Sequence, residues 1–386
     1  MAKPEIRLKG FEGEWEVDLT KNLCKIATGK SNTQDQVENG QYPFYIRSEN
    51  IVRSNKYLYD CEAVITIGDG NIGRVFHYVN GKFDLHQRCY KMTDFERVLG
   101  IYFYYFFSAN FYDRAIKMSA KATVDSVRLD MIADMPIYYP SDKKEQKSIA
   151  DYFNSLDSMI QGVTKKIASL KQMKQACLVS MFPQEGETTP RVRFKGFKGD
   201  WVKVAMGDAF VERHEISTIT NELPQLSFTI EEGVIKPEDR KTNKRDFLIK
   251  DKTNKKYLVT YVDDIIYNPA NVIYGAIHKN SLCNGVVSPI YKIFYTDQDA
   301  SFMECVVRKT EFIQGMTVYM EGTVQKLKTL KPEAFLQMVA NIAPTKDEQK
   351  HIGRFFHSLD SQISLQEQRL EKLKQIKSAC LDKMFV

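Results

Sequence analysis

Residues 145–182 read EQKSIADYFNSLDSMIQGVTKKIASLKQMKQACLVSMF, and residues 348–385 repeat this stretch as EQKHIGRFFHSLDSQISLQEQRLEKLKQIKSACLDKMF. The repeat lies 203 positions further along the chain, and about half of the aligned positions are identical. Self-similarity of this length indicates an internal duplication, which decides how every other segment is interpreted. The fold must therefore contain the same element twice.

Each copy predicts one long helix, because its apolar residues recur at alternating steps of three and four. Asp142-x-x-Glu145 and Thr345-x-x-Glu348 are N-cap signatures at the two starts. A helix of roughly 40 residues would be about 60 Å long, enough to act as a spacer. The predicted seam consists of Leu156, Ile160, Val163, Ile167 and Leu170 in the first copy and Leu359, Ile363, Leu370 and Leu373 in the second.

The pairing of the two helices has two interpretations. A single amphipathic helix usually packs on its own domain. Two near-copies with narrow apolar stripes, one on either side of a second domain, favour pairing with each other in an antiparallel, pseudo-two-fold arrangement.

A second repeat marks where each half of the chain begins. Residues 6–15, IRLKGFEGEW, return 186 positions later as VRFKGFKGDW at 192–201, and both tryptophans of the chain lie in these segments. Between the repeated markers, 16–140 and 202–343 correspond only faintly, chiefly at 122–124 against 322–324. The second variable block is 17 residues longer, which is the difference between the two offsets.

The variable blocks mix strand-like runs at 63–67, 74–79 and 257–261 with a helix-like run at 95–117. We therefore expect an α+β fold: two globular mixed α/β domains separated by two long antiparallel coiled-coil helices, with a pseudo-two-fold internal repeat. The predicted divisions are a first domain at 1–140, a spacer helix at 141–183, a linker and second domain at 184–343, and a spacer helix at 344–386.

Composition is that of a folded globular protein, with 43% hydrophobic and 27% charged residues in 386. The start lacks the apolar core of a secretory signal, and the most apolar run, 101–111, is too short to span a bilayer. We expect a cytoplasmic protein with no membrane partner. The seven cysteines contain no C-x-x-C pair, so we expect reduced thiols and no zinc site. A net charge of +6 is compatible with a polyanionic partner without requiring one.

Motifs for catalysis are absent from the sequence. GDGNIG at 68–73 fits G-x-G-x-x-G, but the strand-like run after it predicts a hairpin or loop rather than a dinucleotide site. NPAN at 268–271 superficially resembles the asparagine-proline loop of amino-group methyltransferases, yet it lacks the second proline and the aromatic residue. There is no phosphate loop, H-E-x-x-H or G-x-S-x-G motif, and the six histidines show no metal-ligand spacing. We expect no catalytic and no metal-binding residues.

These residues resemble the specificity subunits of type I restriction-modification enzymes. The resemblance covers essentially the whole chain and rests on four elements in duplicated order. They are the helix opening at 344–360 (Pro344, Glu348, Gln349, Ile352 and Ser358-Leu359-Asp360), its counterpart at 140–157, the entry Gly196-Phe197-x-Gly199-x-Trp201, and Gly285-Val286-Val287-Ser288-Pro289-x-Tyr291.

The resemblance implies that each variable block is a target-recognition domain that reads one half of a split double-stranded DNA site. The repeated helices would hold these domains apart and dock two modification subunits. Those subunits would bring S-adenosylmethionine and adenine methylation, and restriction subunits would add ATP- and Mg²⁺-dependent cleavage. The chain itself would bind no cofactor and catalyse nothing.

DNA-binding candidates are cationic, amide, imidazole and hydroxyl side chains in polar segments of the two blocks, since Lys and Arg contact phosphates and polar groups read base edges. For each, a turn residue or a solvated surface charge is the alternative. A scaffold that organises partners without reading DNA, and a stand-alone methyltransferase or nuclease, are the competing functions. The candidates are Arg47, Ser48, Asn71, Arg74, His86, Gln87 and Arg88 in the first block and Lys244, Arg245, Lys255, Asn271, Tyr274 and Ser288 in the second.

Overall fold

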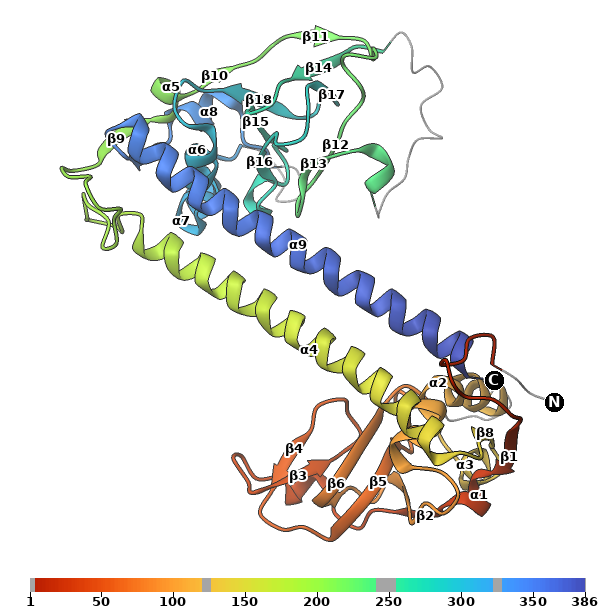
Figure 1. The fold of residues 1–386 in the computed structure, drawn as a ribbon. Helices are drawn as coiled ribbons and strands as arrows, with labels where there is room; N and C mark the ends of the chain where they lie inside the picture. Colours follow the sequence, from red (N-terminus) through yellow and green to blue (C-terminus); the bar gives the residue numbers. More distant parts are fainter. Residues whose placement is uncertain (1–3, 120–125, 241–254, 322–327, 386) are drawn as a thin grey trace. The chain divides into compact units, whose positions relative to one another are not determined.

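Two compact units form the chain in the computed structural model, which describes residues 4–119, 126–240, 255–321 and 328–385 (Figure 1). Unit 1 comprises 1–165 and 368–386, and unit 2 comprises 166–367. The two long helices are present as predicted: α4 (Lys143–Ser180) has 38 residues and α9 (Lys346–Met384) has 39. Each belongs partly to both units, so the predicted spacers are not separate compact bodies, and the predicted domain limits stay a prediction.

A six-stranded sheet is the centre of unit 1, in the order β2-β7-β5-β6-β3-β4. All neighbours are antiparallel except β3 and β6, which are parallel. A separate antiparallel pair, β1 with β8, joins the start of the unit to the residues before α4. The strands are β1 (Trp15–Leu19), β2 (Lys25–Thr28), β3 (Tyr42–Tyr45), β4 (Val52–Ser54), β5 (Tyr59–Ile67), β6 (Phe76–Leu85), β7 (Cys89–Thr93) and β8 (Pro136–Pro140).

The core of unit 1 lies between β5, β6 and the aromatic helix α2 (Gly100–Ser119). Phe103, Phe107 and Phe111 of α2 are fully buried and stack in sequence along the helix. The helix begins five residues later than the sequence pattern predicted, because the Gln146 side chain accepts a hydrogen bond from the Leu99 amide and so marks the helix start. The short helices α1 (Thr20–Leu23) and α3 (Leu129–Ala133) complete the unit.

The glycine-rich segment at 68–73 connects two antiparallel strands, β5 and β6, as the sequence predicted. No helix follows it directly, so the geometry needed to bind a pyrophosphate at a helix start is not formed there. The segment is a hairpin connection.

Unit 2 contains smaller sheets, β10-β18-β15-β16 and β11-β14-β17, with the pairs β12-β13 and β19-β9. All of these pairings are antiparallel. The strands are β9 (Val202–Ala205), β10 (Val211–Glu212), β11 (Ile216–Ser217), β12 (Ser227–Thr229), β13 (Gly233–Ile235), β14 (Tyr257–Thr260), β15 (Ile265–Tyr267), β16 (Ile277–Lys279), β17 (Gly285–Val287), β18 (Lys292–Tyr295) and β19 (Val339–Ile342).

We call the part of each unit outside the two long helices its head. The head of unit 2 contains several short helices where unit 1 has the single long helix α2. Phe302, Met316 and Phe335 are buried in one core with Tyr267 and Phe294 of the sheet. The helices are α5 (Met206–Ala209), α6 (Ala300–Val307), α7 (Thr310–Tyr319) and α8 (Pro332–Gln337).

In unit 1, the beginning of α4 packs against the end of α9. The Tyr152 hydroxyl lies 3.3 Å from the Cys380 thiol, and the ring of Phe153 stacks on Phe385 with centroids 5.5 Å apart. Lys377 forms an ion pair with Asp157. Residue numbers rise along one helix as they fall along the other, so the two segments are antiparallel.

In unit 2, the end of α4 packs against the beginning of α9 in the same way. Lys174 pairs with Asp360, and Lys171 with Glu367. The Asp360–Lys174 pair is the repeat of Asp157–Lys377, since each residue moves by the 203-residue offset. The pairing of like helices is therefore confirmed within each unit, and the alternative that each helix packs only on its own domain is wrong.

The predicted seam residues are buried to different degrees. Leu156, Val163, Ile167, Leu170, Leu359 and Ile363 are buried, whereas Ile160, Leu370 and Leu373 are half-buried. Gln366, the polar member of the second seam, is also buried.

The glutamate of each N-cap signature has a different role from the one predicted. Asp142 caps α4 as expected, accepting from the Lys144 amide at 2.7 Å. Glu145, however, is buried and accepts two hydrogen bonds of 2.7 Å from Arg7, both from the guanidinium group. Glu348 accepts the same two bonds from Arg193. The carboxylate thus ties the opening segment of each repeat to its helix.

The glutamine that follows this glutamate joins the helix to the head. Gln146 donates to the Pro140 carbonyl at 2.8 Å and accepts from the Leu99 amide at 2.8 Å, just before α2. Gln349 donates to the Ala343 carbonyl at 2.8 Å and accepts from the Asp299 amide at 3.1 Å, just before α6. One side chain therefore fixes the start of the head helix in both units.

Candidate functional site

Three side chains form an ion cluster on unit 1, which we call the Arg47–Asp69–Arg88 cluster. Arg88 donates to Asp69 Oδ2 at 2.7 Å, and Arg47 approaches both Asp69 oxygens at 3.2 Å. Arg47 and Arg88 are exposed, while Asp69 is only 20% exposed. The carboxylate therefore lies beneath two arginines whose remaining N–H groups face solvent.

The backbone around this cluster is tightly held. The Arg88 carbonyl accepts from the Gly68 amide at 2.7 Å, and a Cβ at position 68 would lie 2.6 Å from that oxygen, so only glycine fits. The Gln87 amide donates to the Ser31 carbonyl at 2.8 Å, and the His86 amide to the Tyr45 carbonyl at 3.0 Å. The turn carrying Arg88 is thus bound to three other segments of the unit.

Charge in the cluster follows from these contacts. Partial burial acts to raise the pKa of the Asp69 carboxyl, but hydrogen bonds from Arg88 and Arg47 outweigh it, and the pKa lies below its usual value. Burial, aided by the charge of Arg47, lowers the pKa of His86. At neutral pH the histidine is therefore uncharged, and the three charged residues carry one net positive charge.

A cavity of about 270 Å³ adjoins the cluster. Its polar wall is formed by Asp69, Gln87 and Arg88, and Tyr90 closes another side, where its hydroxyl donates to the Val127 carbonyl at 3.2 Å. The cavity therefore places the open edges of the cluster beside a recess rather than on a flat surface.

The other first-block candidates lie apart from these contacts. Arg74 stacks over the ring of Tyr112 on α2, 4.2 Å from its centroid, and hydrogen-bonds its hydroxyl. Asn71 is exposed in the hairpin connection. Ser48 is half-buried, and its hydroxyl accepts from the Asn50 amide at 3.0 Å, which is a turn contact. Of the predicted set, the structure brings together Arg47, His86, Gln87 and Arg88.

Second-block candidates are distributed over several loops of unit 2. Lys255 lies over the ring of Tyr257 at 5.5 Å. Tyr274 is 69% exposed at the end of a short 3-10 turn, η4 (Val272–Tyr274), and Asn271 precedes that turn. Ser288 is half-buried, and its carbonyl accepts from Tyr291. Lys244 and Arg245 lie outside the described residues.

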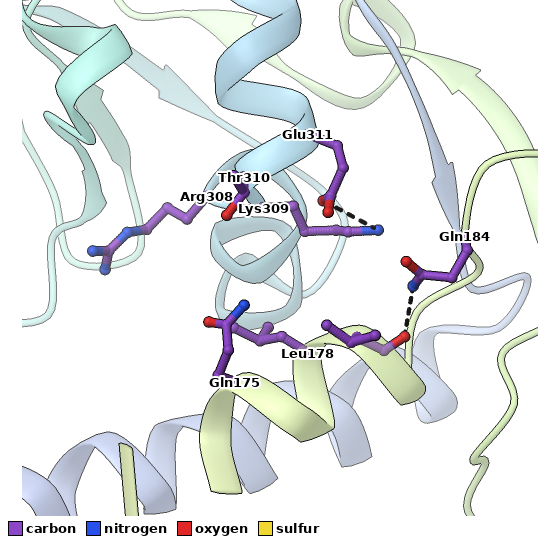
Figure 2. Close-up of a pocket in the computed structure, with 8 residues that line it drawn as sticks. Gln175, Leu178, Gln184, Arg308, Lys309, Thr310 and Glu311 are labelled. Atoms are coloured by element: carbon purple, nitrogen blue, oxygen red, sulfur yellow. Dashed lines mark hydrogen bonds and ion pairs between the residues drawn. The ribbon is translucent and has the colours of Figure 1, made fainter. Parts of the chain in front are cut away.

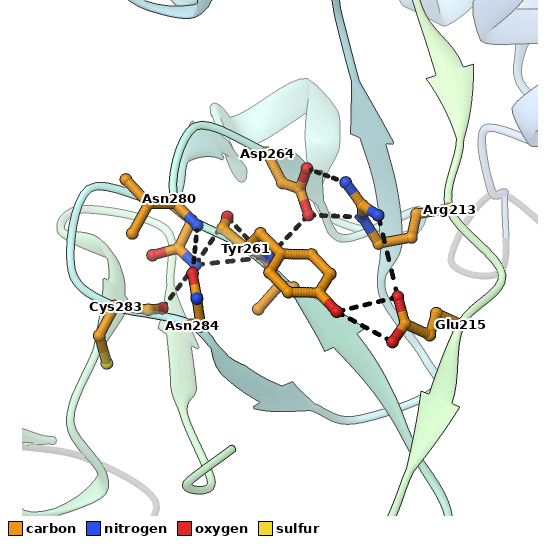
Figure 3. A network of polar contacts seen from close by, with 9 residues as sticks. Arg213, Glu215, Tyr261, Asp264, Asn280, Cys283 and Asn284 are labelled. Atoms are coloured by element: carbon orange, nitrogen blue, oxygen red, sulfur yellow. Dashed lines mark hydrogen bonds and ion pairs between the residues drawn. The ribbon is translucent and has the colours of Figure 1, made fainter. Parts of the chain in front are cut away.

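Unit 2 has its own arginine-centred network, which the sequence did not reveal (Figure 3). Arg213 donates to both oxygens of Asp264, at 2.8 and 2.9 Å, and its guanidinium faces the ring of Tyr261. The Tyr261 hydroxyl donates to Glu215 at 2.9 Å. Since Asp264 is buried and Arg213 only 20% exposed, this network holds strands together and leaves few open donors.

A small pocket of about 40 Å³ lies where the end of α4 meets the α6–α7 junction in unit 2 (Figure 2). Lys309 reaches the Pro183 carbonyl at 3.3 Å and lies 4.0 Å from Glu311, and burial lowers its pKa. The space admits little more than one water molecule. This pocket is too small to hold a cofactor or a nucleotide base.

The part of the chain that the structure describes contains no cluster of metal ligands and no disulfide. Nowhere in it do three or more His, Cys, Asp or Glu side chains converge as metal ligands would. All seven cysteines are free thiols. None of the described helices combines the length and apolar character needed to cross a membrane.

Part of this sequence is similar to a family of known proteins. Residues 12–172 match the family described as type I restriction modification DNA specificity domain. This part of the chain is therefore similar to type I specificity domains. The EcoDI specificity subunit of a type I restriction enzyme from Escherichia coli is 26% identical over 184 residues, which cover 47% of this chain and 40% of that subunit. Less than half of that relative's length is therefore represented in the match.

The fold has a full-length counterpart among solved structures. The S subunit of a type I restriction-modification system from M. genitalium superposes with a TM-score of 0.72 at 13% identity, covering 100% of this chain and 99% of that one. This likeness confirms the predicted fold class for the whole chain. The resemblance that the duplicated motifs indicated is confirmed by these similarities.

In unit 1, the residues that the sequence did not indicate are partners of predicted residues. Asp69 lies inside the glycine-rich motif at 68–73, and nothing in that motif indicates an arginine partner. Its position between two glycines, in a hairpin that must approach other backbone closely, was the available signal. Tyr112 and Ser31 offered no such signal.

Proposed function

We propose that the chain is the DNA-reading, non-catalytic subunit of a type I restriction-modification complex, in which each unit reads one half of an asymmetric bipartite site. One observation carries the proposal: the contacts that tie each repeated segment to its long helix, which we call the frame, are the same in both units, whereas the heads differ. Arg7–Glu145 recurs as Arg193–Glu348, whereas the described residues of unit 2 form no sheet with the strand order of the six-stranded sheet of unit 1.

A duplicated frame with different heads is the arrangement that an asymmetric, interrupted site requires. Two like heads would favour a palindrome, as in symmetric DNA-binding dimers. Two unlike heads present different donors and acceptors, so each can prefer a different short sequence. The cluster on unit 1 and the loops around Lys255 and Tyr274 on unit 2 have different chemistry, which supports this division.

The partners follow from the same proposal. Two modification subunits would dock on the paired helices and bring S-adenosylmethionine for adenine methylation. Restriction subunits would add cleavage that uses ATP and Mg²⁺. The chain would work on double-stranded DNA in the cytoplasm.

Exchange of one variable block tests directly whether each unit recognises its own half of the DNA site. Residues 202–343 are replaced by those of a family relative, and methylated adenines are mapped genome-wide with each version of the gene. We expect one half of the methylated sequence to change and the other half to stay the same. A change in both halves would contradict the proposal.

A salt series separates DNA reading from a scaffold role. With modification subunits present, affinity for cognate duplex should fall steeply with salt and exceed that for a scrambled duplex by about a thousandfold or more. Equal affinity for both duplexes would favour the scaffold. Methylation or cleavage by the purified chain alone would favour a stand-alone enzyme.

A further inference from the structure

We infer that Arg88, held in place by Asp69, reads the guanine of a G·C pair in the half-site recognised by unit 1. The inference rests on the proposed function and deepens it by naming a specificity-determining residue and the base it selects. It starts from the Arg47–Asp69–Arg88 cluster and the recess beside it.

Arg88 has open donors in a fixed position. Its side chain is 62% exposed, and within the described residues its one hydrogen-bonded partner is Asp69, through Nη1. The rest of the guanidinium remains available for a second, bidentate partner. A guanine offers two acceptors, O6 and N7, at the spacing of two guanidinium N–H groups, and this is the commonest specific arginine contact in the major groove.

Asp69 favours a base pair over a phosphate as the partner. A phosphate approaching Arg88 would also approach the Asp69 carboxylate, which repels it. A G·C pair instead presents two acceptors on guanine and one amino donor on cytosine, and a carboxylate accepts from that donor. The Arg88–Asp69 pair offers the matching donors and acceptor side by side.

Arg47 acts as a positioning residue. It lies 3.2 Å from both Asp69 oxygens and so opposes rotation of the carboxylate that orients Arg88. The bound turn at Gln87 and the Gly68–Arg88 backbone bond restrict the main chain as well. Less conformational entropy is then lost when Arg88 binds, which favours a specific contact over a diffuse one.

The first test is the sequence of the half-site itself. Methylation mapping with residues 202–343 exchanged identifies the unchanged half, which is the one assigned to unit 1. That half must contain at least one G·C pair. A half-site made only of A·T pairs overturns the inference while leaving the bipartite reading intact.

The second test is a cross between protein and DNA variants in the complex with its modification subunits. Each guanine of the unit 1 half-site is replaced singly by 7-deazaguanine, which lacks the N7 acceptor. For the unaltered chain, the replacement at one of these positions should lower the affinity roughly tenfold to a hundredfold. For Arg88→Ala the same replacement should not lower the affinity further, because the contact with guanine is already lost.

Three further variants sharpen the result. Arg88→Lys keeps the charge without the planar fork, so the guanine preference should still fall by about tenfold or more. Asp69→Asn should weaken the preference at the same position and at no other. Arg191→Ala is the matched control, since Arg191 is 63% exposed and pairs with Glu187 as Arg88 does with Asp69. It should leave base preference unchanged in both halves.

Two further outcomes would overturn the inference. If Arg88→Ala lowers affinity equally for all duplexes and flattens the salt dependence, Arg88 contacts a phosphate. If it changes neither affinity nor preference, Arg88 does not face DNA. In both cases the unaltered complex still shows its bipartite preference, whereas failure of the proposed function would remove that preference from the unaltered complex too.

Discussion

The two units differ in their heads and agree in their frames. In unit 1 one continuous helix, α2, covers a six-stranded sheet. In unit 2 two shorter helices, α6 and α7, pack beside a four-stranded sheet. Both head helices start at a glutamine bond, from Gln146 in one unit and Gln349 in the other. The frame therefore dictates where a head is attached and leaves its interior free to vary.

The largest effect is expected where the end of a long helix enters a unit's core. Phe385 packs against Phe153 and Tyr102 in unit 1, and its repeat, Phe182, packs against Phe302 and Trp201 in unit 2. Phe385→Ala should destabilise unit 1 by about 3–5 kcal/mol, and Phe182→Ala should destabilise unit 2 by a similar amount. Hydrogen exchange in β5 and in β14 reports the two units separately. Equal loss of protection in both strands from either variant would show that the units unfold as one.

Somewhat smaller losses are expected at the buried glutamates. Glu145→Gln and Glu348→Gln each leave a partly buried arginine without its counter-charge, which should cost about 3 kcal/mol in the affected unit. Glu367→Gln is the control, because its pair with Lys171 is exposed and should be worth less than about 1 kcal/mol. Urea unfolding monitored by hydrogen exchange measures the free energy of unfolding of the affected unit in each variant. Equal costs at Glu145 and Glu367 would show that burial is not what strengthens the pair.

Acid should destabilise unit 2 through His278, in addition to any loss in unit 1 from His86, whose pKa is also lowered. Burial lowers the pKa of His278 to about 3, and its Nε2 lies 2.7 Å from the Ile230 carbonyl. The unfolded chain binds this proton near pH 6.5 and the folded unit does not, so stability is lost as the pH falls below about 6.5. At pH 5 the loss in unit 2 should be about 2 kcal/mol. A His278→Gln variant should lack this component, and an unchanged pH profile in that variant would assign the acid sensitivity to another group.

The smallest difference is expected between the two interhelical ion pairs. Asp157 and Lys377 are both about a quarter exposed, whereas Asp360 is 50% exposed in its pair with Lys174. Double-mutant cycles should give a coupling of about 1 kcal/mol for the first pair and less for the second. Coupling that is stronger in the more exposed pair would contradict this ranking.

The duplicated parts of the chain were predictable because their pattern is periodic and occurs twice. The helix seam from Leu156 to Leu170 could be predicted from the spacing of its apolar residues, and the antiparallel pairing from the two copies on either side of a second domain. Asp142 was identifiable as a cap, but the Arg7–Glu145 bond was not, since its partners are 138 positions apart and no local pattern joins them. The α+β class of the heads was predictable, and their sheet order was not, for the same reason.

The candidate DNA-binding residues were chosen by residue type, which carries no information about neighbours. Arg47 and Arg88 meet at Asp69, although they are far apart in sequence, because three segments of the unit converge there. Arg74 is of the same type but is turned toward Tyr112 on α2. Residue type therefore identifies possible contacts, and only tertiary structure shows which of them form a group.

The glutamine bonds set the conditions for grafting a foreign head onto this scaffold. Gln146 bonds only backbone groups, namely the Leu99 amide and the Pro140 and Arg97 carbonyls. Gln349 bonds the Asp299 amide and the Ala343 carbonyl, and it also donates to the Gln298 side chain at 3.0 Å. A transplanted variable domain could therefore meet the requirements at Gln146 with main-chain atoms alone, whereas at Gln349 it would also have to supply or replace one side-chain acceptor.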